Sequence, residues 1–556
     1  MRQVAEGGFT KWDIVCLLVV TAAATLIHGW IGLYAYSTFS FTDSMDYMFM
    51  ADFYRTAIYG GDLDAVRTFY RNTRFPPLFP ALLGSFGAGT ENQHLTTGIS
   101  NLIAVLAVAV LWIWTRREFN SRVCASAVAL GLLLLPYNFL VNLSAVSEPL
   151  AILMVTAAFA LLAGPHLSAK RIVVVGLIVG MAPLARGALL PLPIAFAIWL
   201  ILARSISFKQ MCLPLIAAFL PFLLWLLYRD LIQSEQYAVH LSAEQFHAAD
   251  IHWPSAIWTQ PQRLFAAFVV TWASPLTPII AATCTAIVTV FAVVGCHIRL
   301  RRNAIDAWFL VGYIFLILIW PFPTEFSRFI VVVYPCILVS CISAVITIDQ
   351  SLRRAKPHFA GWFLFGTIAL ASAPAIYIFL QRAALPVEPE LVAEKRELGF
   401  FLAKSDSDAL LAAEHVARVK YLLLQAESLI PKDGCVYATP PQLASLYSKR
   451  IALAYPSDLG EDNDAASLAL QSCEYYFVGG WAAPAYGLEA YYPSKALQKW
   501  TKPILVSRMG GQEEGNVAAA LLQRAKPEAP REDPNRAETA LGRAADFVSP
   551  SDRLPP

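Results

Sequence analysis

The chain has 556 residues, of which 57% are hydrophobic and only 15% are charged, and its formal net charge is +2. Soluble globular domains carry closer to ~25% charged residues, so this composition excludes a single water-soluble domain and indicates a polytopic α-helical membrane protein. The small positive balance predicts no nucleic-acid partner, because the basic residues fall in short loops between apolar segments.

Apolar segments of membrane length follow one another along the first two thirds of the chain. A bilayer core of about 30 Å needs roughly 20 apolar residues per helix. About eleven segments approach that length, at 12–36, 98–115, 123–141, 146–163, 171–186, 188–203, 211–228, 277–298, 306–321, 328–348 and 360–380. The run 263–276 is too short to span alone, and we expect an interfacial or re-entrant piece there. Residues 1–11 are too polar for a cleaved signal peptide, so we expect the first helix to be retained.

The lysines and arginines predict the orientation in the membrane, because cytoplasmic loops carry an excess of them. The loops assigned to the cytoplasm contain Arg2, Lys11, Arg116, Arg117, Arg122, Lys170, Arg171, Arg204, Lys209, Arg299, Arg301, Arg302, Arg353, Arg354 and Lys356. The N-terminus is then cytoplasmic and the C-terminus periplasmic, in a bacterial inner membrane. Three long polar stretches share the periplasmic side: a first loop at 37–97, a second at 229–262 and everything after 380.

The region 381–523 reads as a small periplasmic α/β domain that follows the transmembrane domain 1–380. Apolar positions recur at helical spacing over 391–430. Short apolar runs separated by turn residues predict strands at Val436–Thr439, Ile451–Tyr455 and Tyr475–Gly479.

Two further features of the C-terminal region bear on its environment. Cys435 and Cys473 can pair if the compartment is oxidising, but the pairing depends on a strand order that the sequence leaves open. The last stretch, 524–556, is rich in Pro, Ala and charge, and we expect it to be disordered.

The first outer loop opens with Asp43, Asp46 and Tyr47, which share one face if this stretch is helical. A carboxylate directly after a membrane helix is partly desolvated at the lipid surface, and this raises its pKa towards the range of a general base. A helix-capping or solvated loop aspartate is the alternative interpretation.

The same loop ends with Arg74 followed by Pro76 and Pro77. The two prolines predict an extended backbone without a helix, which presents Arg74 rigidly beside the membrane. An interfacial arginine that snorkels to the lipid surface explains Arg74 equally well when it is taken alone.

Three more charges lie at the predicted outer ends of apolar spans: Glu148, Arg186 and Arg328. An acid in the first turn favours a helix on its own, which is a sufficient structural reason for Glu148. Charges near membrane depth are costly and tend to mark function. Together with Asp43 and Arg74, they predict a site for an anionic lipid headgroup and a base.

The second outer loop carries His240, Glu244 and His247 at spacings that share a face on a helix. Imidazole and carboxylate groups can ligate a metal, but this spacing matches no established site, and we predict no metal. With Trp253 and Trp258 nearby, we expect this loop to line the entrance for an acceptor.

Five short motifs, in this order and topology, resemble the GT-C glycosyltransferases over about residues 10–380. The resemblance is nearest to bacterial dolichyl-phosphate-mannose–protein mannosyltransferase-like enzymes and to lipid A aminoarabinose and galacturonic acid transferases. The motifs are Asp-x-x-x-Tyr at 43–47, Pro-Pro-Leu-Phe-Pro at 76–80, Ser-Glu-Pro-Leu at 147–150, the hairpin Arg186, and Ser-Arg-Phe at 327–329.

The resemblance implies a GT-C-like fold and transfer of a sugar from a polyprenyl-phosphate donor to an acceptor glycan, lipid or protein, without a cofactor. It implies Asp43 as the base, Tyr47 and Glu148 around the sugar, and Arg74, Arg186 and Arg328 as candidates to hold the lipid phosphate. Members often have two adjacent acids at the loop start. Ser44 stands in the second place here, so the base is either Asp43 or Asp46.

Two other functions remain open. A lipid or polysaccharide transporter also has many helices and intramembrane arginines, but it usually shows repeated halves and a midplane site. A degenerate scaffold or regulator is compatible with Ser44 and with the C-terminal domain.

Overall fold

The computed structural model describes residues 9–34, 42–60, 75–163, 167–203, 208–231, 253–272, 278–322, 325–351, 357–386, 405–438, 441–453, 455, 470, 472–479, 501–508 and 517–524. The chain divides into two compact units, one of them helical and the other α/β. The helical unit comprises Met1–Thr38 and Tyr47–Ala383, and the α/β unit comprises Phe39–Asp46 and Ala384–Pro556.

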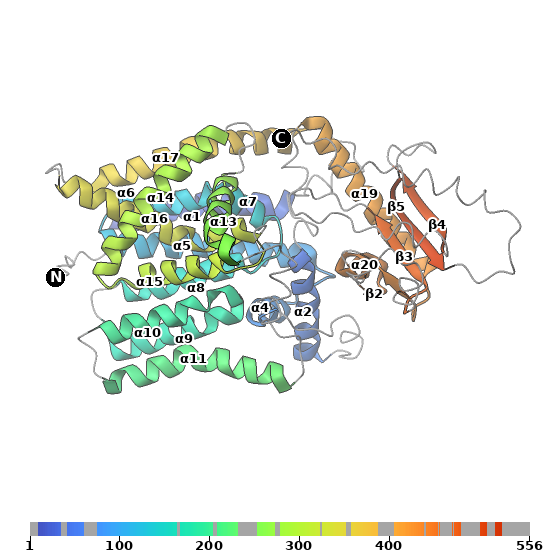
Figure 1. Ribbon diagram of the computed structural model, residues 1–556, viewed down its shortest axis with the longest axis horizontal. Helices are drawn as coiled ribbons and strands as arrows, with labels where there is room; N and C mark the ends of the chain where they lie inside the picture. The colour runs from blue at the N-terminus through green and yellow to red at the C-terminus, as the bar shows by residue number, and fades with distance from the viewer. Residues whose placement is uncertain are drawn as a thin grey trace, which may run out of the picture. The chain divides into compact units, whose positions relative to one another are not determined.

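The helices up to Ala384 follow the apolar segments of the sequence. They are α1 (Lys11–Tyr34), α2 (Thr42–Tyr59), α4 (Leu78–Ser85), α5 (Gln93–Phe119), α6 (Arg122–Leu133), α7 (Pro136–Asn142), α8 (Glu148–Leu162), α9 (Ala169–Ala185), the 3-10 turn η1 (Gly187–Leu189), α10 (Pro191–Leu202), α11 (Phe208–Leu231), α13 (Trp253–Val270), α14 (Pro278–Arg301), α15 (Ile305–Leu318), α16 (Phe326–Ser351) and α17 (Pro357–Ala384). Figure 1 shows α8 to α11 and α15 with roughly parallel axes, whereas α2 runs across that direction.

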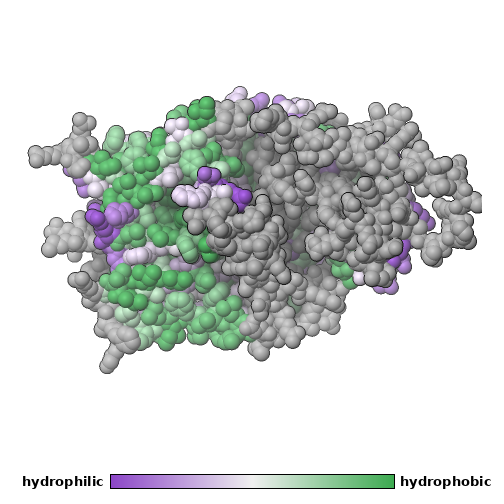
Figure 2. All heavy atoms as spheres, in the orientation of Figure 1, coloured by the Kyte–Doolittle hydropathy of each residue, from purple (hydrophilic) through white to green (hydrophobic). Residues whose placement is uncertain are grey.

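The exposed surface of this unit is apolar, as a lipid environment requires. Helix α16 is buried along most of its length and forms the centre of the packing. In contrast, α11 exposes Leu213, Leu220 and Leu227 by 59%, 46% and 60%. Figure 2 shows apolar side chains covering a broad face of the helices. The protein is therefore an integral membrane protein, as its composition predicts.

When membrane spans are counted by the length and composition of the helices, fewer are found than the sequence predicts. Among the described residues, six helices are long and apolar enough to cross a bilayer, or seven if α6 and α7, bent by 57° at their break, form one span. Helices α8, α10 with η1, and α15 are apolar but shorter. Every predicted span coincides with a helix or with this bent pair, but a count of eleven is not confirmed.

Two local predictions were wrong. The prediction of a short piece at 263–276 misplaced the start of α13, which begins at Trp253 inside the stretch expected to be loop. Pro254 does not prevent this, because a proline fits the first turn of a helix, where its missing N–H has no partner to lose. Pro77 was expected to be extended, but it adopts φ −82° and ψ −20° directly before the first residue of α4. At this position too, the missing N–H of proline costs the helix no hydrogen bond.

The α/β unit has one mixed five-stranded sheet of order β2-β1-β3-β5-β4. Strand β1 is parallel to β2 and β3, and β5 is antiparallel to β3 and β4. Its elements are α19 (Asp406–Leu429), β1 (Cys435–Tyr437), α20 (Pro441–Ser448), β2 (Ile451–Leu453), β3 (Tyr475–Gly479), β4 (Thr501–Arg508) and β5 (Val517–Arg524). Strands β1 to β3 coincide with the predicted runs, whereas β4 and β5 were not predicted.

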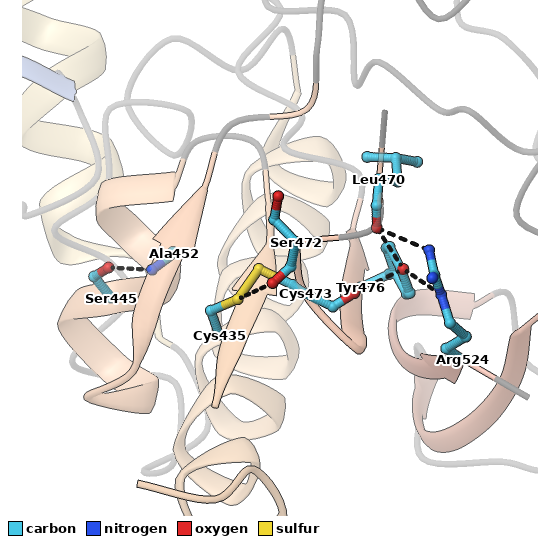
Figure 3. The surroundings of a disulfide bond; sticks show 8 residues. All are labelled: Cys435, Ser445, Ala452, Leu470, Ser472, Cys473, Tyr476 and Arg524. Atoms are coloured by element: carbon cyan, nitrogen blue, oxygen red, sulfur yellow. Dashed lines mark hydrogen bonds between the residues drawn. A yellow bond between two sulfur atoms is a disulfide. The ribbon is translucent and has the colours of Figure 1, made fainter. Parts of the chain in front are cut away.

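Arg524 was expected to open the disordered tail, and this was wrong. It ends β5, and its guanidinium donates to the Tyr476 hydroxyl at 3.2 Å and to the Leu470 carbonyl at 2.9 Å (Figure 3). These contacts fix the end of the strand in the core of the sheet. Residues 525–556 lie outside the described residues.

Cys435 and Cys473 form a disulfide between β1 and the start of β3, with their Cα atoms 5.2 Å apart (Figure 3). The parallel pairing of β1 with β3 brings the two cysteines together, which is the strand order that the sequence left open. The seven other cysteines are not in disulfide bonds, and all of them lie in the helical unit. Since disulfides persist in oxidising compartments, this pair agrees with a periplasmic α/β unit.

Candidate active site

Glu148 begins helix α8, and its side chain is completely buried, at 0% exposure. Pro149 follows it in the first helical turn, where proline is favoured. A carboxylate at this end of a helix also interacts favourably with the free backbone N–H groups. A buried carboxylate is strongly destabilising unless a cation pairs with it, so its neighbours determine what this position does.

Two buried arginines form ion pairs with the same oxygen of Glu148, and Arg328 also donates a hydrogen bond to it. Arg186 follows α9, where the backbone turns extended (φ −154°, ψ 119°) and ends the helix, and its Nη1 lies 3.1 Å from Glu148 Oε1. Arg328, in the first turn of α16, places its Nε 2.7 Å from that oxygen. Their side chains are only 8% and 6% exposed. We call Glu148, Arg186 and Arg328 the arginine–glutamate triad.

The triad contains two guanidinium cations and one carboxylate, so one positive charge is in excess. Glu148 Oε2 and Arg186 Nε are both buried, and neither has a hydrogen-bond partner among the described residues. Unpaired buried polar atoms are costly, and a guanidinium matches the oxygens of a phosphate in geometry and charge. The triad therefore has the properties of an anion-binding site.

Tyr47 of α2 joins the triad through a serine hydroxyl. The Tyr47 hydroxyl lies 3.0 Å from Ser147 Oγ, which in turn accepts a hydrogen bond from Arg186 Nη1 at 3.3 Å. The Tyr47 ring packs against Phe75 and Phe79, with ring centroids 5.2 Å away in each case. The first outer segment is thus packed directly on the triad.

Asp43 and Asp46 lie on α2 as the sequence predicts. The helix begins at Thr42, so Asp43 is in its first turn, one turn before Tyr47 on the same face. Asp43 is half-buried, and Asp46 is buried, at 7% exposure. Both belong to the α/β unit, whereas the helical unit resumes at Tyr47. The choice between them as the base stays a prediction.

Four predicted site residues, Arg74, His240, Glu244 and His247, lie outside the described residues. Within the parts of the chain that the structure describes, no group of three His, Cys, Asp or Glu side chains is placed to hold a metal ion.

A second polar attachment of α2 was missed in the sequence. Asp52, 7% exposed, accepts hydrogen bonds from the Thr90 hydroxyl and from the Thr90 N–H at 3.1 Å, and it pairs with Arg55 at 3.2 Å. Burial raises the pKa of Asp52, and the Thr90 hydrogen bonds and Arg55 offset part of that rise. The dense packing at Gly89, where a Cβ atom would lie 1.9 Å from Asp52 Oδ1, shows how closely the segment after α4 covers this carboxylate.

No family model and no curated protein sequence matches this chain. Solved structures do. ArnT from Cupriavidus metallidurans in the apo state is similar over 92% of this chain and 99% of that chain, with a TM-score of 0.51 and 13% identity. The chain shares the fold of ArnT. ArnT bound to undecaprenyl phosphate gives a TM-score of 0.50 and 13% identity over 94% of this chain and 100% of that chain.

An archaeal oligosaccharyltransferase, AglB from Archaeoglobus fulgidus in complex with an inhibitory peptide and a dolichol-phosphate, aligns at 12% identity over 94% of this chain and 76% of that chain, with a TM-score of 0.46. The predicted fold class is confirmed by the ArnT structures, which extend over the helical unit and the α/β unit alike.

Proposed function

We propose that this protein is a membrane glycosyltransferase that moves a sugar from a polyprenyl-phosphate donor to an acceptor hydroxyl on the periplasmic face. The observation that carries the proposal is the arginine–glutamate triad, in which two buried guanidinium groups share one carboxylate oxygen. The GT-C fold, found in an ArnT structure with undecaprenyl phosphate bound, supports a lipid phosphate as the anion.

The charges of the triad match this ligand. A sugar joined to a lipid by one phosphate is a phosphodiester with a single negative charge, and the triad carries one positive charge in excess. Within a buried site such an attraction is much stronger than in water. When the sugar leaves, negative charge builds on the phosphate, and Arg186 and Arg328 already stand at fixed positions to stabilise it.

The reaction is a single displacement at the anomeric carbon. Asp43, or Asp46 in its place, accepts the proton of the acceptor hydroxyl while that oxygen attacks the anomeric carbon. The bond from this carbon to the phosphate oxygen breaks, and its electron pair stays on the lipid phosphate. One displacement inverts the configuration of the sugar. This step uses a lipid-linked sugar as its substrate and needs no cofactor.

The remaining predicted residues have supporting roles in this proposal. Arg74 adds a third cation for the lipid phosphate, and His240, Glu244 and His247 line the path of the acceptor. The membrane lipids, the carrier lipid and an acceptor glycan, lipid or protein are the expected partners. Mannose, aminoarabinose, galacturonic acid, arabinose and glucose are all compatible sugars.

The test is consumption of lipid-linked sugars by purified protein in nanodiscs. A panel of polyprenyl-phosphate sugars is supplied with membrane extract as the source of acceptors, beside Asp43→Asn and Asp46→Asn. We expect the wild type to consume one donor, and only one of the two variants to lose this activity while still binding that donor. Full activity in both variants contradicts the assignment of the base. Donor binding without turnover by the wild type favours the scaffold, and neither binding nor turnover favours the transporter.

A further inference from the structure

The hydroxyl of Tyr47, a residue that the resemblance places around the sugar, is directed at Ser147. Tyr47 is 2% exposed, and its ring lies edge-on to Phe79 and tilted against Phe75. The ring packs in the apolar cluster that also contains Leu150 and Ala185. The hydroxyl lies 3.0 Å from Ser147 Oγ, within hydrogen-bond distance.

This bond is the first link of a continuous chain that ends on the second arginine. The links are Tyr47 to Ser147 at 3.0 Å, Ser147 to Arg186 Nη1 at 3.3 Å, Arg186 Nη1 to Glu148 Oε1 at 3.1 Å, and Glu148 Oε1 to Arg328 Nε at 2.7 Å. Arginine only donates, so Ser147 Oγ accepts from Arg186 Nη1, and either hydroxyl can be the donor between Tyr47 and Ser147. Hydrogen bonds in such a buried chain strengthen one another.

This series of polar contacts orients the planar guanidinium of Arg186. Two oxygens hold Nη1, one from Ser147 and one from Glu148, whereas Nε is buried and has no hydrogen-bond partner among the described residues. Because the guanidinium is rigid, fixing Nη1 also fixes the direction of the Nε–H bond. The Phe329 ring, with its centroid 5.1 Å from the guanidinium carbon, limits movement of the group further.

We propose that Tyr47 and Ser147 are positioning residues that hold Nη1 of Arg186, so that its Nε–H is aimed at a phosphate oxygen of the carrier lipid. Neither residue touches the substrate in this account, and both act through the arginine. The inference rests on the proposed function, because it assigns the anion of the triad to a lipid phosphate.

The test compares the affinities of undecaprenyl phosphate and undecaprenol, which have the same tail and differ in the headgroup. Tyr47→Phe keeps the ring in its apolar cluster and removes only the hydroxyl. We expect the affinity for undecaprenyl phosphate to fall by up to about tenfold, the effect of one lost hydrogen bond between neutral groups, and the affinity for undecaprenol to stay unchanged. A role confined to stability would lower both affinities or the melting temperature.

Ser147 gives the second half of the test. Ser147→Ala should cause the same loss, Ser147→Thr should restore the affinity, and the double variant should lose no more than either single variant, because both changes break one chain. Tyr59→Phe is the matched control on the same helix, since the Tyr59 hydroxyl bonds the Ser85 carbonyl at 2.7 Å and its side chain is 64% exposed. It should leave both affinities unchanged.

The outcomes separate the two proposals. If the wild type binds both lipids equally, the phosphate site itself is contradicted, and the positioning role is contradicted with it. If the wild type prefers the phosphate and Tyr47→Phe keeps the full preference, the positioning role alone is overturned. Equal losses in Tyr47→Phe and Tyr59→Phe also overturn it.

Discussion

Two buried arginine clusters that contact α16 differ in charge balance, and the difference separates a binding site from a structural clamp. At the start of α16, Arg328 and Arg186 share one carboxylate. About 22 Å along the same helix, Ser343 contacts Arg299, which meets two carboxylates: Asp306 through two bonds of 2.7 Å, and Glu118 at 3.0 Å.

The Arg299 cluster uses its donors on its own acids, whereas the triad leaves Arg186 Nε and Glu148 Oε2 without partners among the described residues. Burial of a charged residue in a membrane protein is therefore a weak sign of function by itself. Excess positive charge together with an unused donor is the stronger sign.

The largest expected effect is on stability, in the structural cluster. Arg299→Gln leaves the buried Asp306 without its cation, and we expect a loss of about 3–5 kcal/mol in the free energy of unfolding. Unfolding in detergent measures this loss. Arg301→Gln, an exposed position two residues further on, is the control and should change the free energy by less than about 0.5 kcal/mol. Protein of the Arg299→Gln variant that stays folded should keep its affinity for undecaprenyl phosphate. A loss of that affinity with intact stability would reverse the roles of the two clusters.

The next effect is on transfer, in the triad. Arg328→Lys keeps the positive charge but loses the planar fork that reaches Glu148 and a phosphate oxygen. We expect transfer to slow about 100-fold with the melting temperature nearly unchanged, as measured by donor consumption and thermal unfolding. A large drop in melting temperature without a change in the rate per folded molecule would make the triad a second structural clamp.

A third comparison lies within α2, which has a polar attachment at Tyr47 and another at Asp52. Gly89→Ala places a Cβ atom 1.9 Å from Asp52 Oδ1, and we expect this overpacking to cost about 1–3 kcal/mol. Gly98→Ala is the control, because no described heavy atom lies within 4 Å of a Cβ atom there, and alanine favours a helix by up to about 1 kcal/mol. The Gly89 variant should keep the preference for undecaprenyl phosphate over undecaprenol. Losing that preference would show that the two attachments act together.

The smallest effect is a pH dependence at Asp52. Burial raises the pKa of its carboxyl above the unfolded value of 3.8, so the folded state binds this proton more tightly than the unfolded state. The stabilisation from Asp52 is fully present below pH 3.8 and is lost as the pH rises through the folded pKa. Unfolding midpoints of the wild type and of Asp52→Asn across this window should therefore diverge, with the variant showing the flatter profile. Parallel profiles would contradict the raised pKa.

The sequence predicted the features that depend on local pattern. Hydropathy located each of the six long apolar helices in the described part of the chain, because twenty apolar residues in a row have few alternatives. The spacing of Asp43, Asp46 and Tyr47 predicted their shared face, and α2 confirmed that they are helical. Glu148, Arg186 and Arg328, which the sequence grouped together, do lie in contact.

The features that the sequence did not predict depend on contacts between segments that are far apart in the sequence. Ser147 belongs to the Ser-Glu-Pro-Leu motif at 147–150, but its partner Tyr47 lies 100 residues earlier in the chain. No local pattern in the sequence relates the two residues. Likewise, Asp52 and Thr90 are 38 residues apart. Strand β4 contains Lys502 and Pro503 and is largely exposed, so it lacks the apolar alternation that predicts a strand.

The central claim is that the triad holds the phosphate of a lipid-linked sugar during transfer. The most direct test is a single-turnover assay in nanodiscs that follows the appearance of undecaprenyl phosphate from undecaprenyl-phosphate sugars, with wild type and Arg328→Lys side by side. The account predicts release of undecaprenyl phosphate by the wild type and release about 100-fold slower by the variant. Equal rates in the two proteins, or no release from any donor by the wild type in the presence of acceptor extract, would contradict it.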